Sequence, residues 1–237
     1  MDVSAIRGVL FDKDGTLFEF AATWVAWAEQ MLLRGCEGDK GRAAAAGAAI
    51  GFDLEARRFA RDSVAIAGTS AQIAAALHPH FADLTVPALQ ARLDAEAARA
   101  PQRAAVPLKP LLSALRDRGL KLGVATNYAE HPARAHLTEA GVAEMFDFIA
   151  GFDSGHGGKP EPGQLLAFAR AVDLPPTRIA MVGDSLHDLH AAAAAGMVPV
   201  AVLTGLAARA ELAPHAEVVL PDIGHLPDWL ERYKGAG

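Results

Sequence analysis

Short apolar runs rich in valine and isoleucine recur along the chain, and each run ends in a polar residue or a glycine. Runs of this length predict β-strands, and their continuous apolar character is typical of strands buried on both faces of a sheet. The predicted strands are Ile6–Asp12, Leu120–Asn127, Phe146–Gly151, Ile179–Asp184, Val198–Thr204 and Glu217–Leu220.

Helical segments separate the later strands. Several begin with proline or an N-cap type of residue and close at a glycine, which are the usual signals for the two ends of a helix. The predicted helices are Pro110–Arg118, Pro132–Ala140, Pro162–Val172 and Asp188–Ala195. This alternation of strands and helices predicts an α/β fold with a parallel sheet.

Residues 18–105 interrupt the alternation. They are rich in alanine with scattered leucine, arginine and glutamate, and they contain no convincing strand. Apolar residues such as Trp24 and Trp27 recur at helical spacing. We therefore expect an α/β core made of residues 1–17 and 106–237, with residues 18–105 inserted as a helical domain.

Composition excludes several classes of partner. The 237 residues carry a formal net charge of −6 and a pI near 5.8, which gives no general attraction to a nucleic-acid backbone. No run is long and charge-free enough to span a bilayer, and the first residues, MDVSAIRG, do not resemble a signal peptide. The lone Cys36 forms no internal disulfide. We expect a cytoplasmic protein that binds a small molecule, without membrane or nucleic-acid partners.

The first strand runs directly into two carboxylates, in the stretch VLFDKDGTL. Side chains alternate along a strand, so Asp12 and Asp14 are expected on one face and Lys13 on the other. The carboxyl ends of parallel strands are where open sheets bind their ligands. The alternative is an ordinary acidic turn, in which Gly15 supplies a positive φ and Asp14 bonds to the backbone.

Four stretches of the chain resemble, in the same order, the motifs of the haloacid dehalogenase superfamily of phosphatases. They are DKDGTL, GVATN, GGKPEPG and MVGDSLHDLHAAAAAGM, and each comes just after a predicted strand. Together the matches cover the chain outside the helical insertion. The resemblance implies a Rossmann-like core with an inserted α-helical cap domain. It also implies a Mg²⁺-dependent phosphatase similar to phosphoglycolate phosphatases.

The resemblance implies a role for each matched acidic residue. Asp12 would be the nucleophile that takes the phosphoryl group, and Asp14 would act first as general acid and then as general base. Mg²⁺ prefers oxygen ligands, and these would be Asp12, the backbone carbonyl of Asp14, and Asp184. Asp188 would support them by orienting the catalytic lysine or a metal-bound water.

The resemblance also implies how the substrate phosphate is held. Lys159 would supply a cation, and Thr126 and the amide of Asn127 would donate hydrogen bonds to the phosphoryl oxygens. The backbone N–H groups of Lys13 and Asp14, in the turn after the nucleophile, would contribute further donors. The side chain of Lys13 is expected to be structural or to contact the insertion.

A helical insertion at this place resembles a mobile cap, which would exclude water and select the substrate. A small phosphorylated metabolite fits such a site, with phosphoglycolate first, because Arg57, Arg58 and Arg61 form a basic cluster that could meet its carboxylate. A solvated helix face is the alternative for this cluster. Glu19 and Phe20 depart from the residues common at the hinge of relatives.

Two other functions stay open. A phosphomutase of the β-phosphoglucomutase type would use the same nucleophile, but the hinge histidine characteristic of sugar phosphomutases is absent between Leu17 and Glu37. A non-catalytic metabolite-binding module would be expected to lack one of the catalytic residues, and all are present. The sequence thus favours hydrolysis.

Overall fold

A six-stranded parallel sheet forms the centre of the protein, whose computed structural model describes residues 6–60 and 63–233. The strand order is β5-β4-β1-β6-β7-β8, so the first strand lies in the interior of the sheet. The strands are β1 (Gly8–Phe11), β4 (Lys121–Ala125), β5 (Phe148–Ala150), β6 (Ile179–Gly183), β7 (Val198–Val202) and β8 (Val218–Leu220). The parallel α/β fold expected from the sequence is confirmed.

Both faces of the sheet are covered by helices, as the continuous apolar strands predict. Val9 and Phe11 belong to one apolar cluster, whereas Leu10 belongs to another on the opposite face. The covering helices are α6 (Leu108–Asp117), α7 (Glu130–Glu139), α8 (Gly163–Ala171), α9 (Leu186–Ala195), α10 (Arg209–Leu212) and α11 (Leu226–Arg232). Short 3-10 helices are η1 (His78–His80), η2 (Ala143–Met145), η3 (Pro176–Arg178), η4 (Ala213–His215) and η5 (Ile223–His225).

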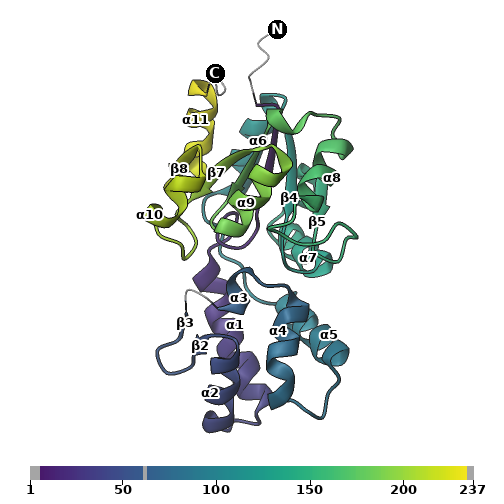
Figure 1. Ribbon diagram of the computed structural model, residues 1–237, viewed down its shortest axis with the longest axis vertical. Coiled ribbons are helices and arrows are strands. Elements are labelled where there is room, and N and C mark those ends of the chain that lie inside the picture. The colour runs from purple at the N-terminus through teal and green to yellow at the C-terminus, as the bar shows by residue number, and fades with distance from the viewer. Residues whose placement is uncertain (1–5, 61–62, 234–237) are drawn as a thin grey trace.

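A second group of helices lies beyond one end of the sheet and fills the lower part of Figure 1. These helices are α1 (Phe20–Gly35), α2 (Lys40–Ala49), α3 (Val64–Ala67), α4 (Ser70–Leu77) and α5 (Val86–Ala97). The expectation that this block contains no strand is wrong in one place. A short antiparallel pair, β2 (Phe52–Asp53) and β3 (Arg58–Phe59), forms where two phenylalanines face each other across the pair.

The helical block has its own apolar core, which includes the two tryptophans of α1 and the small residues of α2. Ala43 and Ala46 are completely buried. At Gly47, an added Cβ would lie 2.8 Å from the carbonyl oxygen of Phe52. The alanine-rich stretch is therefore a close-packed helix.

Two chain segments connect the block to the sheet, and they pair with each other. Phe18 and Ala104 form an antiparallel bridge. The N–H of Ala105 donates to the carbonyl of Leu17 at 2.9 Å. The N–H of Glu19 donates to the backbone carbonyl of Arg103 at 2.8 Å. Both connections thus leave the sheet side by side. None of the helices in the described part of the chain has the length and apolar character needed to cross a bilayer.

Candidate active site

Three interior strands end at one edge of the sheet, and each is followed at once by a polar residue. Asp12 follows β1, Thr126 follows β4 and Asp184 follows β6. Phe11 pairs with Val124 on one side and with Val182 on the other, so the three strand ends are in register. Parallel pairing thereby brings together side chains that are more than 50 residues apart in the sequence.

Lys159 lies at the centre of this cluster. Its Nζ donates to Asp12 Oδ1 and to Asp188 Oδ1, both at 2.6 Å, and to the carbonyl of Ala125 at 2.8 Å. Asn127 fixes the lysine backbone, since its side chain accepts from the Lys159 N–H at 2.7 Å and donates to the Lys159 carbonyl at 2.8 Å. The ammonium is therefore held in one position among the carboxylates.

The carboxylates outnumber the cation. Asp12, Asp184 and Asp188 are all buried, and each offers an oxygen within 4.8 Å of the others. Burial raises the pKa of Asp12 to about 7, and nearby Asp188 adds to this rise against the opposing effect of Lys159. Burial and the same carboxylates raise the pKa of Asp184 well above its usual value. Burial favours the neutral amine of Lys159, but Asp12 and Asp188 raise its pKa.

This charge imbalance fits a divalent cation. Three carboxylates around one ammonium leave an excess of negative charge in a buried site, which is costly unless a further cation is present. Mg²⁺ takes carboxylate oxygens and keeps several waters, so a cluster of this composition suits it. Among the described side chains, Asp12, Asp184 and Asp188 form a group of carboxylates that could hold a metal.

Asp188 is positioned by the first turn of α9. The N–H and the hydroxyl of Ser185 both donate to Asp188 Oδ2, at 3.1 and 2.7 Å. This reciprocal capping arrangement satisfies the start of the helix and leaves the other oxygen, Oδ1, for Lys159. Asp188 thus contacts Lys159, while its role in orienting the lysine or a metal-bound water stays a prediction.

Asp184 is enclosed by backbone that only glycine can supply. A Cβ at Gly15 would lie 2.4 Å from Asp184 Oδ2, and a Cβ at Gly205 would lie 1.6 Å from it. Gly15 also has a φ of 87°, a conformation that L side chains rarely adopt. Thr204 donates from its hydroxyl to the Gly15 carbonyl at 2.5 Å, which ties the two glycine segments together.

The hydroxyl of Thr126 is oriented by its neighbours. Thr126 is 3% exposed, and its Oγ1 accepts from the N–H of Tyr128 at 3.1 Å, so the hydroxyl proton is available to another acceptor. Gln164 donates to the Thr126 carbonyl at 3.0 Å. This geometry suits a donor to a phosphoryl oxygen, the role that the resemblance implies.

Asp14 and Lys13 do not face opposite ways as expected. β1 ends at Phe11, so the strand alternation stops before these residues, and Lys13 Nζ donates to Asp14 Oδ1 at 2.5 Å. The lysine side chain is completely buried and also donates to His136 Nδ1 at 3.2 Å. It lies 5.8 Å from the ring centroid of Trp24, which confirms the expected contact with the insertion.

His136 joins the two parts of the molecule. Its Nε2 donates to the carbonyl of Ala97 at the end of α5, at 2.7 Å, so Nδ1 is the acceptor for the lysine. Burial, assisted by the Lys13 cation, lowers the pKa of His136 to about 4. The ring is therefore neutral at physiological pH. Nothing in the sequence distinguishes this histidine from other residues on a buried helix face.

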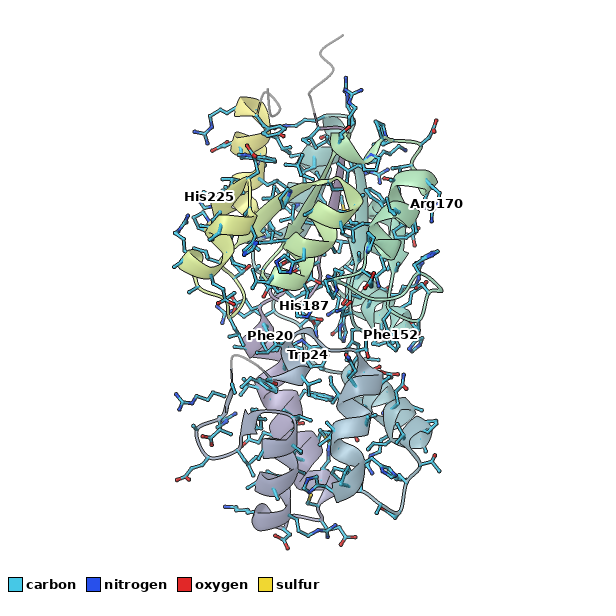
Figure 2. The ribbon with its side chains drawn as sticks, in the orientation of Figure 1. Phe20, Trp24, Phe152, Arg170, His187 and His225 are labelled. Atoms are coloured by element: carbon cyan, nitrogen blue, oxygen red, sulfur yellow. The ribbon has the colours of Figure 1, made fainter. Side chains whose placement is uncertain are left out.

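A cavity lies between the sheet edge and the helical block, and its two sides differ in chemistry. The sheet-side floor is polar and consists of Asp12, Asp14, Thr126, Asn127, Lys159, Asp184, Ser185, His187 and Asp188. The helical wall is apolar and consists of Phe20, Trp24, Trp27, Phe59, Ala65, Ile66, Gly68 and Ile73. Tyr128 joins them. Figure 2 shows Phe20, Trp24 and His187 at this junction.

A comparison with known families identifies this arrangement. The sequence model of the haloacid dehalogenase-like hydrolases matches residues 6–196, which is most of the chain. The chain belongs to this family. The match begins before β1 and ends at the glycine that closes α9, so it includes every strand end that contributes to the sheet-side floor.

Individual relatives agree with the family. The chain is 40% identical over 121 residues to a phosphoglycolate phosphatase of Rhodospirillum rubrum, and this match covers 51% of the chain and 50% of that relative. The chain thus spans about half the length of this curated relative. It is 32% identical over 202 residues to a phosphoglycolate phosphatase of Xylella fastidiosa, covering 84% of the chain and 81% of the relative.

Solved structures share the fold. A predicted phosphoglycolate phosphatase from Haemophilus somnus superposes with a TM-score of 0.70 at 21% identity, covering 94% of this chain and 97% of that one. At this identity the likeness concerns the fold alone.

Within this family fold, the structure does not place the described arginines of the basic cluster in the cavity. Arg57 is 57% exposed and pairs with Glu29 at 2.8 Å on the surface. Arg58 is exposed on β3, and Arg61 lies outside the described residues. The solvated alternative therefore holds for Arg57 and Arg58. Phe20 is one of the two residues that depart from the pattern common at the hinge of relatives. It lies in the helical wall of the cavity.

Proposed function

We propose that this protein is a Mg²⁺-dependent phosphatase that hydrolyses a small phosphorylated metabolite through an aspartyl-phosphate intermediate. The observation that carries the proposal is the buried cluster of Asp12, Asp184 and Asp188 around the single ammonium of Lys159. Membership of a hydrolase family and similarity to phosphoglycolate phosphatases support it.

The cluster explains how a carboxylate attacks an anion. Asp12, Asp184 and the Asp14 carbonyl would hold Mg²⁺, which when bound neutralises charge on the phosphate and on the nucleophile. The ammonium group of Lys159 is the second cation, and its Nζ lies 2.6 Å from Asp12 Oδ1. A carboxylate oxygen of Asp12 attacks phosphorus as the bond from phosphorus to the leaving oxygen breaks, and the donors of Thr126 and Lys159 stabilise the charge on the transferring oxygens.

Asp14 is the proposed acid and base. In the first half-reaction it donates a proton to the leaving alkoxide, and in the second it takes a proton from the water that attacks the aspartyl phosphate. The Asp14 carboxyl group is paired with Lys13 in this structure, so it must turn from that partner toward the leaving oxygen. His136 can then accept the lysine hydrogen bond, because its Nδ1 is already in contact.

We propose that residues 18–105 act as a cap over the sheet edge formed by residues 1–17 and 106–237. Both connections leave the sheet beside the first carboxylates, and the block supplies the helical wall. Such a cap excludes water from the phosphoenzyme and contacts the part of the substrate beyond the phosphate.

Phosphoglycolate is the reference substrate, because it appears in the names of relatives that match half of the chain or more. Its carboxylate would need a cation near the helical wall. Arg57 and Arg58 do not supply one, so this assignment depends on Arg61 among the three arginines of the cluster.

The decisive experiment measures phosphate release from benzyl phosphate, phosphoglycolate and acetyl phosphate, with Mg²⁺ and with a chelator. Wild-type protein should release phosphate only with Mg²⁺. Asp12→Asn should reduce kcat by at least about 1,000-fold, since an amide is not a nucleophile, while the thermal midpoint is retained. The exposed Asp117→Asn variant is the matched control and should equal wild type.

Three outcomes refute the proposal. Normal turnover by Asp12→Asn removes the aspartyl-phosphate mechanism. Absence of Mg²⁺-dependent release from all substrates favours a metabolite-binding module. Transfer of the phosphoryl group to a sugar rather than to water identifies the phosphomutase alternative.

A further inference from the structure

The helical wall carries no charged side chain among its described residues, although it faces a site built for an anion. Phe20, Trp24 and Trp27 follow one another at i, i+4 and i+7 along α1, so they share one face of that helix. Phe59 and Ile66 extend the apolar surface from β3 and α3. A substrate whose phosphate lies on the sheet-side floor therefore meets aromatic and aliphatic groups beyond the phosphate.

The tryptophans are held rigidly and their polar atoms lack partners. Trp24 and Trp27 are each 5% exposed, and their rings meet edge to face with centroids 5.2 Å apart. Trp24 also packs against the Tyr128 ring at 5.0 Å. Neither indole N–H has a hydrogen-bond partner among the described residues. Both indole nitrogens are themselves buried, so the tryptophans offer no accessible donor to the cavity.

Charged and highly hydroxylated substrates fit this wall poorly. A carboxylate removed from water against aromatic rings needs a cation, and the buried lysines among the described residues, Lys13 and Lys159, are already paired with carboxylates. A sugar would bury many hydroxyl groups, and the wall offers no accessible side-chain donor or acceptor among its described residues. An aromatic or compact apolar group loses nothing on transfer to such a surface and stacks on it.

We propose that the helical wall is a binding subsite for an apolar, preferably aromatic, alcohol, so that the protein prefers a phosphate monoester of that alcohol to phosphoglycolate or a sugar phosphate. This inference rests on the proposed phosphatase function and names its substrate class. The sheet-side floor holds the phosphate, and the helical wall takes the leaving alcohol.

The test compares three phosphate esters of primary alcohols, so that the leaving groups are similar. Benzyl phosphate, phosphoglycolate and glucose 6-phosphate are assayed with saturating Mg²⁺, and kcat/KM is obtained for each. We expect benzyl phosphate to exceed both others by at least tenfold. Equal or better turnover of phosphoglycolate or glucose 6-phosphate overturns the inference and leaves the phosphatase function standing. Absence of Mg²⁺-dependent release from these esters and from acetyl phosphate refutes both.

A variant converts the wall and reverses the preference. Ile66→Arg places a cation in the helical wall, and it should lower kcat/KM for benzyl phosphate and raise it for phosphoglycolate, each by about tenfold. Ala45→Arg, on an exposed position of α2, is the matched control and should behave like wild type. A folded Ile66→Arg protein with unchanged preference overturns the inference. The wild-type ratio decides the question independently if this variant does not fold.

Discussion

The polar groups on the two sides of the cavity differ in their hydrogen bonding. On the sheet-side floor, Lys159 bonds to two carboxylates and a carbonyl, and Asp188 is bonded through both oxygens. On the helical wall, the indole donors of Trp24 and Trp27 have no partner among the described residues. The floor is thus organised by polar contacts before any substrate arrives, whereas the wall presents apolar surface to the cavity. Preorganised donors serve the reaction, and an apolar surface suits an apolar part of a substrate.

A methyl group on Gly205 should damage the floor most. Its Cβ would lie 1.6 Å from Asp184 Oδ2, so Gly205→Ala must displace that carboxylate. We expect Mg²⁺ affinity, measured by calorimetric titration, to fall about 100-fold, as it does for metal sites with displaced supporting groups. Asp184→Asn should lower the Mg²⁺ affinity at least as much. Gly41→Ala, whose new Cβ would meet its nearest neighbour at 3.4 Å, is the control. Wild-type affinity in both active-site variants would contradict the ligand assignment.

Removal of Lys13 tests the place where floor and wall meet. Lys13→Met leaves Asp14 without its cation, and breaking a buried ion pair from one side costs about 3 kcal/mol of stability. We expect kcat to fall about tenfold or more with a smaller change in KM, because the turn that carries Asp12 and Asp14 loses its contact with His136. Lys121→Met removes an exposed pair with Asp147 and serves as control. An unchanged kcat would show that Lys13 is only structural.

His136 makes the same junction sensitive to acid. The pKa of His136 is lowered to about 4 in the folded protein by burial and by Lys13, against 6.5 for the free side chain. The unfolded chain therefore binds the proton more readily, and stability is lost as pH falls from 6.5 toward 4. At pH 5 this loss amounts to about 2 kcal/mol.

Urea unfolding at pH 7.5 and pH 5 measures this effect. The free energy of unfolding should fall less between pH 7.5 and pH 5 in His136→Gln than in wild type, and the difference should be about 2 kcal/mol. His131→Gln alters an exposed histidine, so this variant should lose as much stability between the two pH values as wild type does. Equal pH sensitivity of wild type and His136→Gln would exclude a neutral buried ring.

The smallest effect is expected outside both surfaces. Arg57→Ala removes an exposed ion pair with Glu29, worth about 0.2–1 kcal/mol, and should leave KM for phosphoglycolate unchanged. Arg61→Ala is the informative partner, because the phosphoglycolate assignment depends on that residue. A KM raised tenfold by Arg57→Ala would show that this arginine reaches the substrate after all.

Much of the sheet-side floor was predictable from local sequence. Asp12, Thr126 and Asp184 follow strands that are recognisable as short apolar runs, and parallel strands end at a common edge. The order of the motifs then indicated the family that the comparison shows. The ends of the strands were predictable within a few residues for the same reason.

Other features were decided by the tertiary structure. The contact of Lys13 with His136 joins residues 123 positions apart, and no local periodicity encodes that distance. Gly205 matters only because Asp184 packs against it. The tryptophans of α1 have the spacing of ordinary core residues, and they are part of the apolar core of the helical block. Their position in the helical wall depends on how the helical block meets the sheet edge. Local patterns determine strands and their ends, whereas long-range packing decides which side chains share a cavity.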